Sequence, residues 1–274
     1  MNRFLVILRI VGIAFIATSA SASFIAFDSA SDPAYSGGWT NGSNGGYGFG
    51  PWVLTHPFPS IAFGIGPSTE NDDGVDDGVL WGLANDGDIG NAFRLRGVDQ
   101  TATAGRRFLH GPLTVGQTFS IEFDNGWQNE ALYAIRLYET DSSFNPINLS
   151  FEVFLQLSAF YERGPGDTWL QHGTEGVRLD FTITGTVDYG SYTNYAYSAT
   201  LTRRDGVASN VTGEVSYLPN YVQAANLVPF GGNPVREGFY INRMSIVPEP
   251  ASVAFIALGA AVIGFARRKN FHRM

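Results

Sequence analysis

The residues best suited to metal chemistry lie in one acidic stretch, ENDDGVDDGVLWGLANDGDIG, which begins at Glu70. Calcium takes about six to eight oxygen ligands, and loops rich in Asp and Asn with glycine hinges supply them. A calcium site would draw on Asp72, Asp73, Asp76, Asp77, Asp86 and Asp88. The spacing is not that of an EF-hand, and Asn85-Asp86-Gly87-Asp88 equally suits a solvated turn without metal. Calcium is therefore a candidate ligand, with the solvated loop as the alternative.

A second group of carboxylates, Glu122, Asp124 and Glu130, invites comparison with glycosidases that have sandwich folds. Residues two apart on a strand point to the same face, so Glu122 and Asp124 would share one. Glu130 follows a turn expected at Asp124-Asn125-Gly126, which displaces it from the other two. Glycosidases need their carboxyl groups at a defined separation, so we interpret the group as a polar strand face ending in a turn.

Composition excludes several classes of protein. The chain has no cysteine, so disulfides and thiol nucleophiles are impossible. His56, His110 and His172 show neither the spacing of a zinc site nor a Ser-His-Asp pattern. Residues 23–247 contain 11 basic and 24 acidic residues, a net charge of −13, which repels nucleic acid and anionic lipid headgroups. We assign no catalytic residue, and expect a protein that is not an enzyme and binds no nucleic acid.

Residues 36–52, SGGWTNGSNGGYGFGPW, combine glycine with large aromatic residues. Glycine permits positive φ, and the rings offer flat apolar faces. The candidate glycan-binding residues are Trp39, Tyr47, Phe49 and Trp52, whose rings would pack against the C–H faces of pyranoses. The alternative is an ordered loop whose aromatic rings close one end of the fold, because large aromatic residues are usually buried.

The elements that must position these residues are β-strands. Several stretches alternate apolar and polar residues with period two, as half-buried strands do. In residues 118–124, Phe119, Ile121 and Phe123 would share one face. Further strands are expected at residues 149–157, 177–184, 192–201 and 239–247. Turn residues separate these strands and no internal repeat occurs, so the pattern predicts one antiparallel sandwich or barrel.

Both ends of the chain have the composition of addressing segments. Residues 1–22 combine Arg3 and Arg9 with an apolar run and end in Ala20-Ser21-Ala22, which predicts a signal peptide and its helix. Residues 251–266 are uncharged and precede a basic cluster, which predicts a short transmembrane helix with a cytoplasmic C-terminus. A buried core helix is the alternative for this segment. Residues 23–246 would then form the exported body.

The C-terminal tail has three parts: Val247-Pro248-Glu249-Pro250, the apolar segment, and Arg267-Arg268-Lys269. Over residues 247–274 this arrangement resembles the PEP-CTERM sorting signal of Gram-negative bacteria. The resemblance implies recognition by an exosortase, a membrane cysteine protease understood to cut near the PEP motif, and a host that makes extracellular polysaccharide. The sorting residues would be Val247, Pro248, Glu249, Pro250, Arg267, Arg268 and Lys269.

A second resemblance covers about residues 28–205. The stretches GWTNGSNGGYGFGPW (38–52), WGLAN (81–85), VGQTF (115–119) and FDNGW (123–127) are similar to motifs of a group of uncharacterised PEP-CTERM proteins. Members of this group are expected to be lectin-like jelly rolls. The fold that we expect is therefore all-β, an antiparallel jelly-roll sandwich of the concanavalin or lectin-like kind, with a signal helix before it and a transmembrane helix after it.

Together these features predict an exported, exosortase-processed protein of the cell envelope or extracellular matrix. It would be anchored in the inner membrane before processing. Its expected partners are the exosortase, the membrane as a transient anchor, and exopolysaccharide, with carbohydrate binding as a further candidate activity and calcium as the one candidate cofactor. The alternative function is a polysaccharide-degrading enzyme on the same sandwich fold.

Overall fold

The computed structural model describes residues 23–57, 62–66, 92–96, 101–125, 132–156, 159–162, 168–171, 176–203, 205–227 and 238–248. Residues 23–249 form one compact unit. Within the described ranges, no helix has the length and apolar character needed to cross a membrane. The expected signal helix at 1–22 and membrane helix at 251–266 lie outside these ranges.

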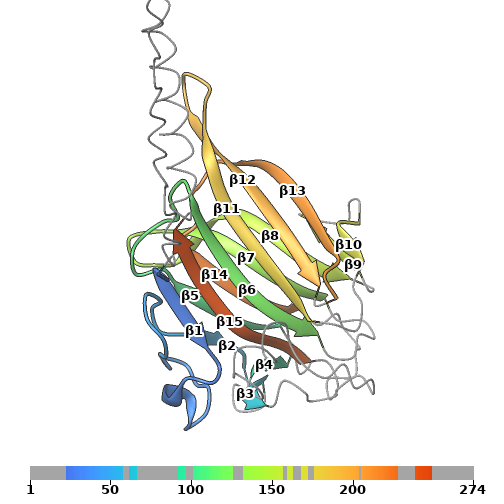
Figure 1. Ribbon diagram of the computed structural model, residues 1–274. Helices are drawn as coiled ribbons and strands as arrows, with labels where there is room; N and C mark the ends of the chain where they lie inside the picture. The colour runs from blue at the N-terminus through green and yellow to red at the C-terminus, as the bar shows by residue number, and fades with distance from the viewer. Residues whose placement is uncertain are drawn as a thin grey trace, which may run out of the picture. The chain divides into compact units, whose positions relative to one another are not determined.

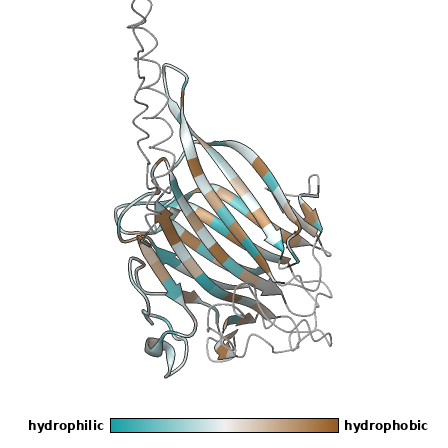
Figure 2. Ribbon diagram, viewed as in Figure 1, coloured by the Kyte–Doolittle hydropathy of each residue, from teal (hydrophilic) through white to brown (hydrophobic). Residues whose placement is uncertain are grey.

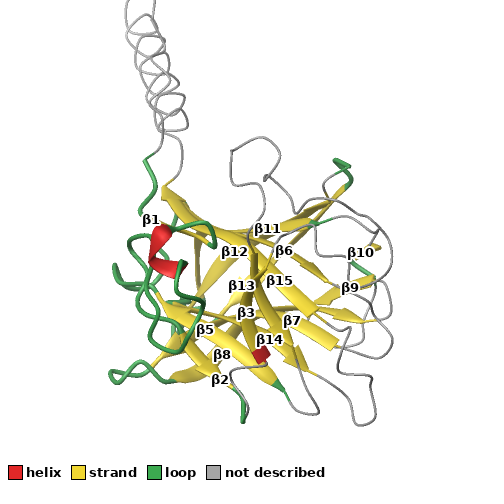
Figure 3. Ribbon diagram, turned by 90° about the horizontal axis from the view of Figure 1, so that it is seen from below, coloured by secondary structure: helices red, strands yellow, loops and turns green. Residues whose placement is uncertain are grey.

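The described strands form two antiparallel sheets, which Figure 3 shows as two layers. The front sheet contains, in spatial order, β13 (Ala208–Val215), β12 (Thr193–Arg203), β11 (Val177–Asp188), β6 (Gln117–Asn125), β15 (Gly238–Pro248), β4 (Ala92–Arg96) and β3 (Phe63–Gly66), and β1 (Ala26–Ser29) also pairs with β15. The back sheet contains, in spatial order, β10 (Leu170–Gln171), β9 (Ala159–Glu162), β8 (Pro146–Gln156), β7 (Leu132–Thr140), β14 (Tyr221–Leu227), β5 (Ala102–Arg107) and β2 (Val53–Thr55). A short 3-10 helix, η1 (Pro33–Tyr35), follows β1.

The connections wrap the chain as a jelly roll. The strand pairs β4/β5, β6/β7 and β14/β15 are consecutive in sequence, and the two members of each pair lie in different sheets. The spatial order β11-β6-β15-β4 in one sheet is matched by β8-β7-β14-β5 in the other. The chain therefore passes repeatedly between the layers, and the predicted all-β antiparallel sandwich is confirmed (Figure 1).

The core lies between the sheets because one face of each strand is apolar. Phe119, Ile121 and Phe123 of β6 are buried, as their alternation predicts, and Leu179 and Phe181 of β11 lie in the same core cluster. Figure 2 shows this alternation of hydrophobic and hydrophilic residues along the strands. The predicted strands correspond to β6, β8, β11, β12 and β15 and are confirmed.

The first and last described strands lie side by side. β1 pairs antiparallel with β15, with Ala26 opposite Ile246 and Ser29 opposite Arg243 (Figure 1). β15 also pairs with β6 and with β4. The final strand of the body therefore occupies the interior of the front sheet.

Candidate functional site

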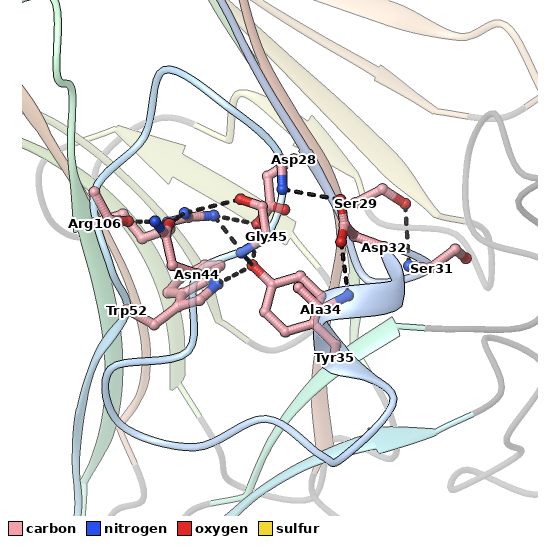
Figure 4. A network of polar contacts seen from close by, with 12 residues as sticks. Asp28, Ser29, Ser31, Asp32, Ala34, Tyr35, Asn44, Gly45, Trp52 and Arg106 are labelled. Atoms are coloured by element: carbon pink, nitrogen blue, oxygen red, sulfur yellow. Dashed lines mark hydrogen bonds and ion pairs between the residues drawn. The ribbon is translucent and has the colours of Figure 1, made fainter.

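The glycine-aromatic loop is organised by a buried ion pair that joins the two sheets. Asp28 of β1 is opposite Met244, and Arg106 of β5 is opposite Val222, so both side chains point into the core. Both side chains are fully buried, and the guanidinium of Arg106 donates to the carboxylate of Asp28. This pair stands at the centre of the network in Figure 4.

The remaining guanidinium donors of Arg106 hold the loop backbone. Its Nε donates to the carbonyl oxygen of Gly50 at 2.7 Å, and its Nη2 donates to the side-chain oxygen of Asn44 at 2.6 Å. Nη2 also reaches the carbonyl oxygen of Gly45 at 3.3 Å. Because these acceptors come from three loop residues, one side chain fixes the path of the loop.

Tyr35 of η1 closes the same network. Its hydroxyl donates to Asp28 at 2.8 Å and accepts from the amide of Gly45 at 2.9 Å and from Nε1 of Trp52 at 3.1 Å. Burial, partly opposed by the charge of Arg106 and the hydrogen bond from Tyr35, raises the pKa of Asp28 from 3.8 to about 6. Burial also raises the pKa of Tyr35, which therefore stays protonated. The network has a structural role, because Oδ2 of Asp28 accepts from both Arg106 and Tyr35 and the hydroxyl of Tyr35 accepts from the loop.

The candidate glycan-binding residues fall into two groups. Trp39, Phe49 and Trp52 are only 3%, 1% and 1% exposed, and the ring centroids of Trp39 and Trp52 lie 5.0 Å apart at 82°. The guanidinium of Arg106 lies over the rings of Phe49 and Trp52. The packing alternative therefore describes these three rings. Tyr47 is 51% exposed, so the packing alternative does not describe it and its predicted sugar contact stays a prediction.

The candidate calcium ligands Asp72, Asp73, Asp76, Asp77, Asp86 and Asp88 lie outside the described residues, so that site stays a prediction. Among the residues that the structure describes, no group of three or more His, Cys, Asp or Glu side chains could hold a metal ion.

Glu122 is held in the front sheet. It is buried at 5% exposure, and the side-chain amide of Asn242 lies 3.5 Å from its carboxylate at a bulge of β15. Asp124 lies two residues further along β6, and Glu130 falls outside the described residues. Because Glu130 and the side chain of Asp124 lie outside what the structure describes, the arrangement of the three carboxylates stays a prediction.

The outer face of the back sheet carries another cluster of polar side chains. Nε of Arg136 lies 2.5 Å from the carboxylate of Glu152, and Tyr138 is opposite Tyr221. Burial raises the pKa of Tyr221 to about 12, and burial also raises that of Tyr138. A general base needs a pKa near the working pH, so these tyrosines are poorly suited to proton abstraction.

An exposed pair of aromatic rings lies at the tip of the β11–β12 hairpin, between the strands expected at residues 177–184 and 192–201. Tyr189 and Tyr192 are 49% and 58% exposed, and their rings stack with centroids 4.9 Å apart and planes 20° apart. The tip is closed by the amide of Tyr189, which donates to the carbonyl of Tyr192, and Gly190 has a φ of +80°. In Figure 1 this hairpin reaches past the neighbouring strands.

The neighbouring strand holds the pair in place. The hydroxyl of Tyr189 donates to both carboxylate oxygens of Glu214 on β13, at 3.0 and 2.9 Å. The side chain of Asn194 donates to the same carboxylate at 3.0 Å. The hydrogen bond to Glu214 raises the pKa of Tyr189. The sequence DYGSYTN contains a signal for this pair, because its two tyrosines enclose the turn residues Gly190 and Ser191.

The sorting motif begins inside the fold. Val247 and Pro248 are the last residues of β15, and Glu249, Pro250, Arg267, Arg268 and Lys269 lie outside the described residues. The two facing antiparallel sheets define a jelly-roll β-sandwich. Residues 247–269 match the family model described as the PEP-CTERM protein-sorting motif. The chain therefore carries a PEP-CTERM sorting signal, which indicates export, membrane anchoring before processing, and processing by an exosortase.

No curated protein matches the chain. Among solved structures, it is similar to the PL-14 alginate lyase of Aplysia kurodai, with 10% identity, a TM-score of 0.37, and coverage of 58% of this chain and 83% of the lyase. It is also similar to the metal-free carbohydrate recognition domain of Emp46p, with 12% identity, a TM-score of 0.33, and coverage of 57% and 81%. A carbohydrate esterase of the Shiga toxin-encoding bacteriophage phi24B is 10% identical, with a TM-score of 0.40 and coverage of 72% and 90%. The activities named for these three proteins are not assigned to this chain.

Proposed function

We propose that this chain is an exported, exosortase-processed protein of the cell envelope or extracellular matrix, and that its body binds a neutral polysaccharide without cutting it. The sorting motif at residues 247–269 supports the first half. The stacked, exposed pair of Tyr189 and Tyr192 is the observation that carries the second half.

The tyrosine pair suits a pyranose ring for physical reasons. The apolar C–H face of a sugar packs against an aromatic face, while a phenol hydroxyl can hydrogen-bond the sugar's hydroxyl groups. Stacking and the bonds to Glu214 fix the ring of Tyr189 before any ligand arrives. A fixed side chain loses less conformational entropy on binding, so more of the contact energy is retained as affinity.

Local charge favours a neutral sugar over an acidic one. The carboxylate of Glu214 lies beside the tyrosine pair, and Asp188 ends the strand that leads into the turn. Residues 23–247 as a whole carry a net charge of −13. Negative groups near the rings and over the body would repel uronate or sulfate groups, whereas a neutral hexose experiences no such repulsion.

The test uses residues 23–249 and the exopolysaccharide of the native host, with binding measured by affinity electrophoresis in calcium and again in EDTA. We expect Tyr192→Ala to weaken binding about fivefold, because loss of one aromatic contact of this kind is worth roughly 1 kcal/mol. Tyr217→Ala is the matched control, because Tyr217 is also an exposed tyrosine, at 42%, outside the hairpin tip.

The outcomes separate the parts of the proposal. If the two variants lose the same amount of affinity, or if neither loses any, the tyrosine pair is not the binding site. Absence of binding by the unaltered body in both solutions would remove polysaccharide binding altogether. Loss of binding in EDTA alone would support the calcium prediction at residues 72–88.

A polysaccharide-degrading enzyme is the second candidate, favoured by the ion pair of Arg136 and Glu152 beside Tyr138. The raised pKa keeps Tyr138 protonated, so in such an enzyme it would donate a proton and would not act as the base. The chain length of the same polymer after incubation with the body distinguishes it from a binding protein. We expect the length to stay constant. If the body shortens the polymer and Tyr138→Phe or Glu152→Gln abolishes this activity, the enzyme replaces the non-enzymatic proposal. The variant Glu122→Gln tests the carboxylate of the front sheet in the same assay.

A further inference from the structure

The last strand of the body contains the first residues of the sorting motif. β15 ends at Pro248, whereas the matched motif begins at residue 247. Val247 is opposite Thr118 and Pro248 is opposite Gln117 in the β6 ladder. Two residues of the motif therefore belong to the front sheet and are not part of a free linker.

The chain is held still more firmly one residue earlier. Ile246 lies between two strands, opposite Phe119 of β6 and Ala26 of β1. Its carbonyl oxygen accepts the amide of Ile25 at 2.7 Å, and its side chain is fully buried. Residues up to Ile246 are thus fixed from both sides, and residues 247 and 248 from one side.

Pro248 gives a physical reason for the strand to end where it does. Proline has no backbone N–H, so it cannot donate to a ladder, and within sheets it is confined to edges, bulges and strand ends. The first proline of the motif therefore has a structural role in this chain. It marks the boundary between backbone committed to the sheet and the sequence that follows.

A protease takes its substrate as an extended segment and supplies its own backbone hydrogen bonds to it. Backbone that is already paired within a sheet is unavailable for this. We infer that the folded body excludes the exosortase from the peptide bonds of β15, so that processing cuts C-terminal to Pro248. Val247 and Pro248 then remain in the mature protein as the end of β15. This inference rests on the exosortase processing in the proposed function.

The chemistry at the cut bond is amide hydrolysis. The carbonyl carbon on the body side forms a bond to the oxygen of water, and its bond to the nitrogen of the tail breaks. The body gains a C-terminal carboxylate, and the tail leaves with a free amino group. No residue of the described body has to take part in this step.

The first test is the intact mass and the C-terminal peptide of mature protein from a host that contains an exosortase and expresses the full chain. We expect the final residue to be Pro248 or a later one. A mature chain that ends at Val247 or earlier would overturn the inference. A chain that keeps all of residues 249–274 would instead contradict the processing part of the proposed function.

The second test does not depend on the exosortase. Full-length protein from a host without the enzyme is purified in detergent and trimmed with proteinase K, and the stable product is identified by mass. We expect trimming from the C-terminus to stop at Pro248 or beyond, and digestion into residues 239–246 would overturn the inference.

Two variants connect this limit to β15. Ile246→Ala removes a fully buried side chain, so the end of the strand should fray and the digestion limit should move upstream by a few residues. Val247→Thr, at a half-buried position, serves as the matched control and should leave the limit unchanged. If digestion of Ile246→Ala stops at the same residue as in the unaltered protein, pairing of β15 is not what protects the chain from the protease.

Discussion

At the scale of single residues, the ion pair of Asp28 and Arg106 connects β1 to β5 and so joins the two sheets. Both side chains are fully buried, and Arg106 also holds the backbone of Gly45 and Gly50. Burying two charges is expensive, and the cost is recovered only when the remaining donors are satisfied. The network around Tyr35 supplies this satisfaction, so the pair specifies where the loop lies as well as joining the sheets.

The raised pKa of Asp28 predicts how this pair responds to acid. The folded pKa is about 6 and the ordinary value is 3.8, so between these values the native state binds more protons than the unfolded state. Linkage then makes the contribution of Asp28 to the free energy of unfolding greater at pH 5 than at pH 7, by about 1 kcal/mol. This contribution is complete below pH 3.8 and is lost as the pH rises through 6.

The measurement compares urea unfolding of residues 23–249 with that of Asp28→Asn at pH 7 and at pH 5. All other titrating groups are shared, so the stability difference between the two proteins isolates Asp28. We expect the free energy of unfolding of the unaltered protein to increase, relative to that of Asp28→Asn, when the pH falls from 7 to 5. A constant difference would show that the effects of burial and Arg106 on the pKa of Asp28 cancel, and a shift in the other direction would show that Arg106 dominates.

At the scale of elements, the glycine-aromatic loop depends on close backbone contact. Gly46 has a φ of +66°, and a Cβ added there would lie 2.0 Å from the carbonyl oxygen of Phe27. The loop and β1 are joined at this point, because Phe27 and Tyr47 exchange backbone hydrogen bonds of 2.9 and 2.8 Å. Gly46 is therefore required by both its conformation and its contact.

Gly46→Ala should lower the free energy of unfolding by about 2 kcal/mol or more, through positive-φ strain and the clash with β1. Gly37→Ala is the matched control, because a Cβ at Gly37 would meet nothing within 4 Å and its φ is not positive. Thermal unfolding of the two variants measures the difference. Equal stability in both would mean that the loop does not pack against β1 in solution.

The sequence predicts the elements better than it predicts the candidate site. Strands such as β6 and β11 are readable because their core faces alternate regularly. β5 was not predicted, because its core face carries Ala102, Ala104 and Arg106, and an inward-facing arginine hides the apolar pattern. The partner of Arg106 lies 78 residues away in the chain, so no local pattern could identify it.

The local sequence also does not show which aromatic residues are buried. The loop that contains Trp39 and Trp52 and the turn that contains Tyr189 and Tyr192 both combine glycine with large rings. The first pair packs into the core against Phe93, whereas the second pair is exposed. Whether a ring is covered depends on strands far away in sequence, which composition does not report.

At the scale of the whole molecule, the body depends on its last strand. β15 lies between β6 and β4 and also pairs with β1, and it supplies Met244 and Ile246 to the core. The sheet therefore cannot be completed without residues that border the sorting motif.

Truncation should show this dependence. A body that ends at residue 244 loses Ile246, and burying an isoleucine typically contributes about 2–5 kcal/mol, so its urea midpoint should fall steeply compared with residues 23–249. A body that ends at residue 247 keeps Ile246 and should differ little. Comparable midpoints for all three proteins would show that the end of β15 contributes nothing to the fold.

The pairing of β1 with β15 also has a kinetic consequence. The partners Ala26 and Ile246 are separated by almost the whole body, and contacts between such distant residues slow folding. At roughly 5–20 residues per second of synthesis, the first strand waits on the order of 10–40 s for its partner to be made. During that interval β1 has an unpaired edge that other chains could join. Chaperones that hold unfolded chains are therefore expected to matter for this protein during export, until its final strand arrives.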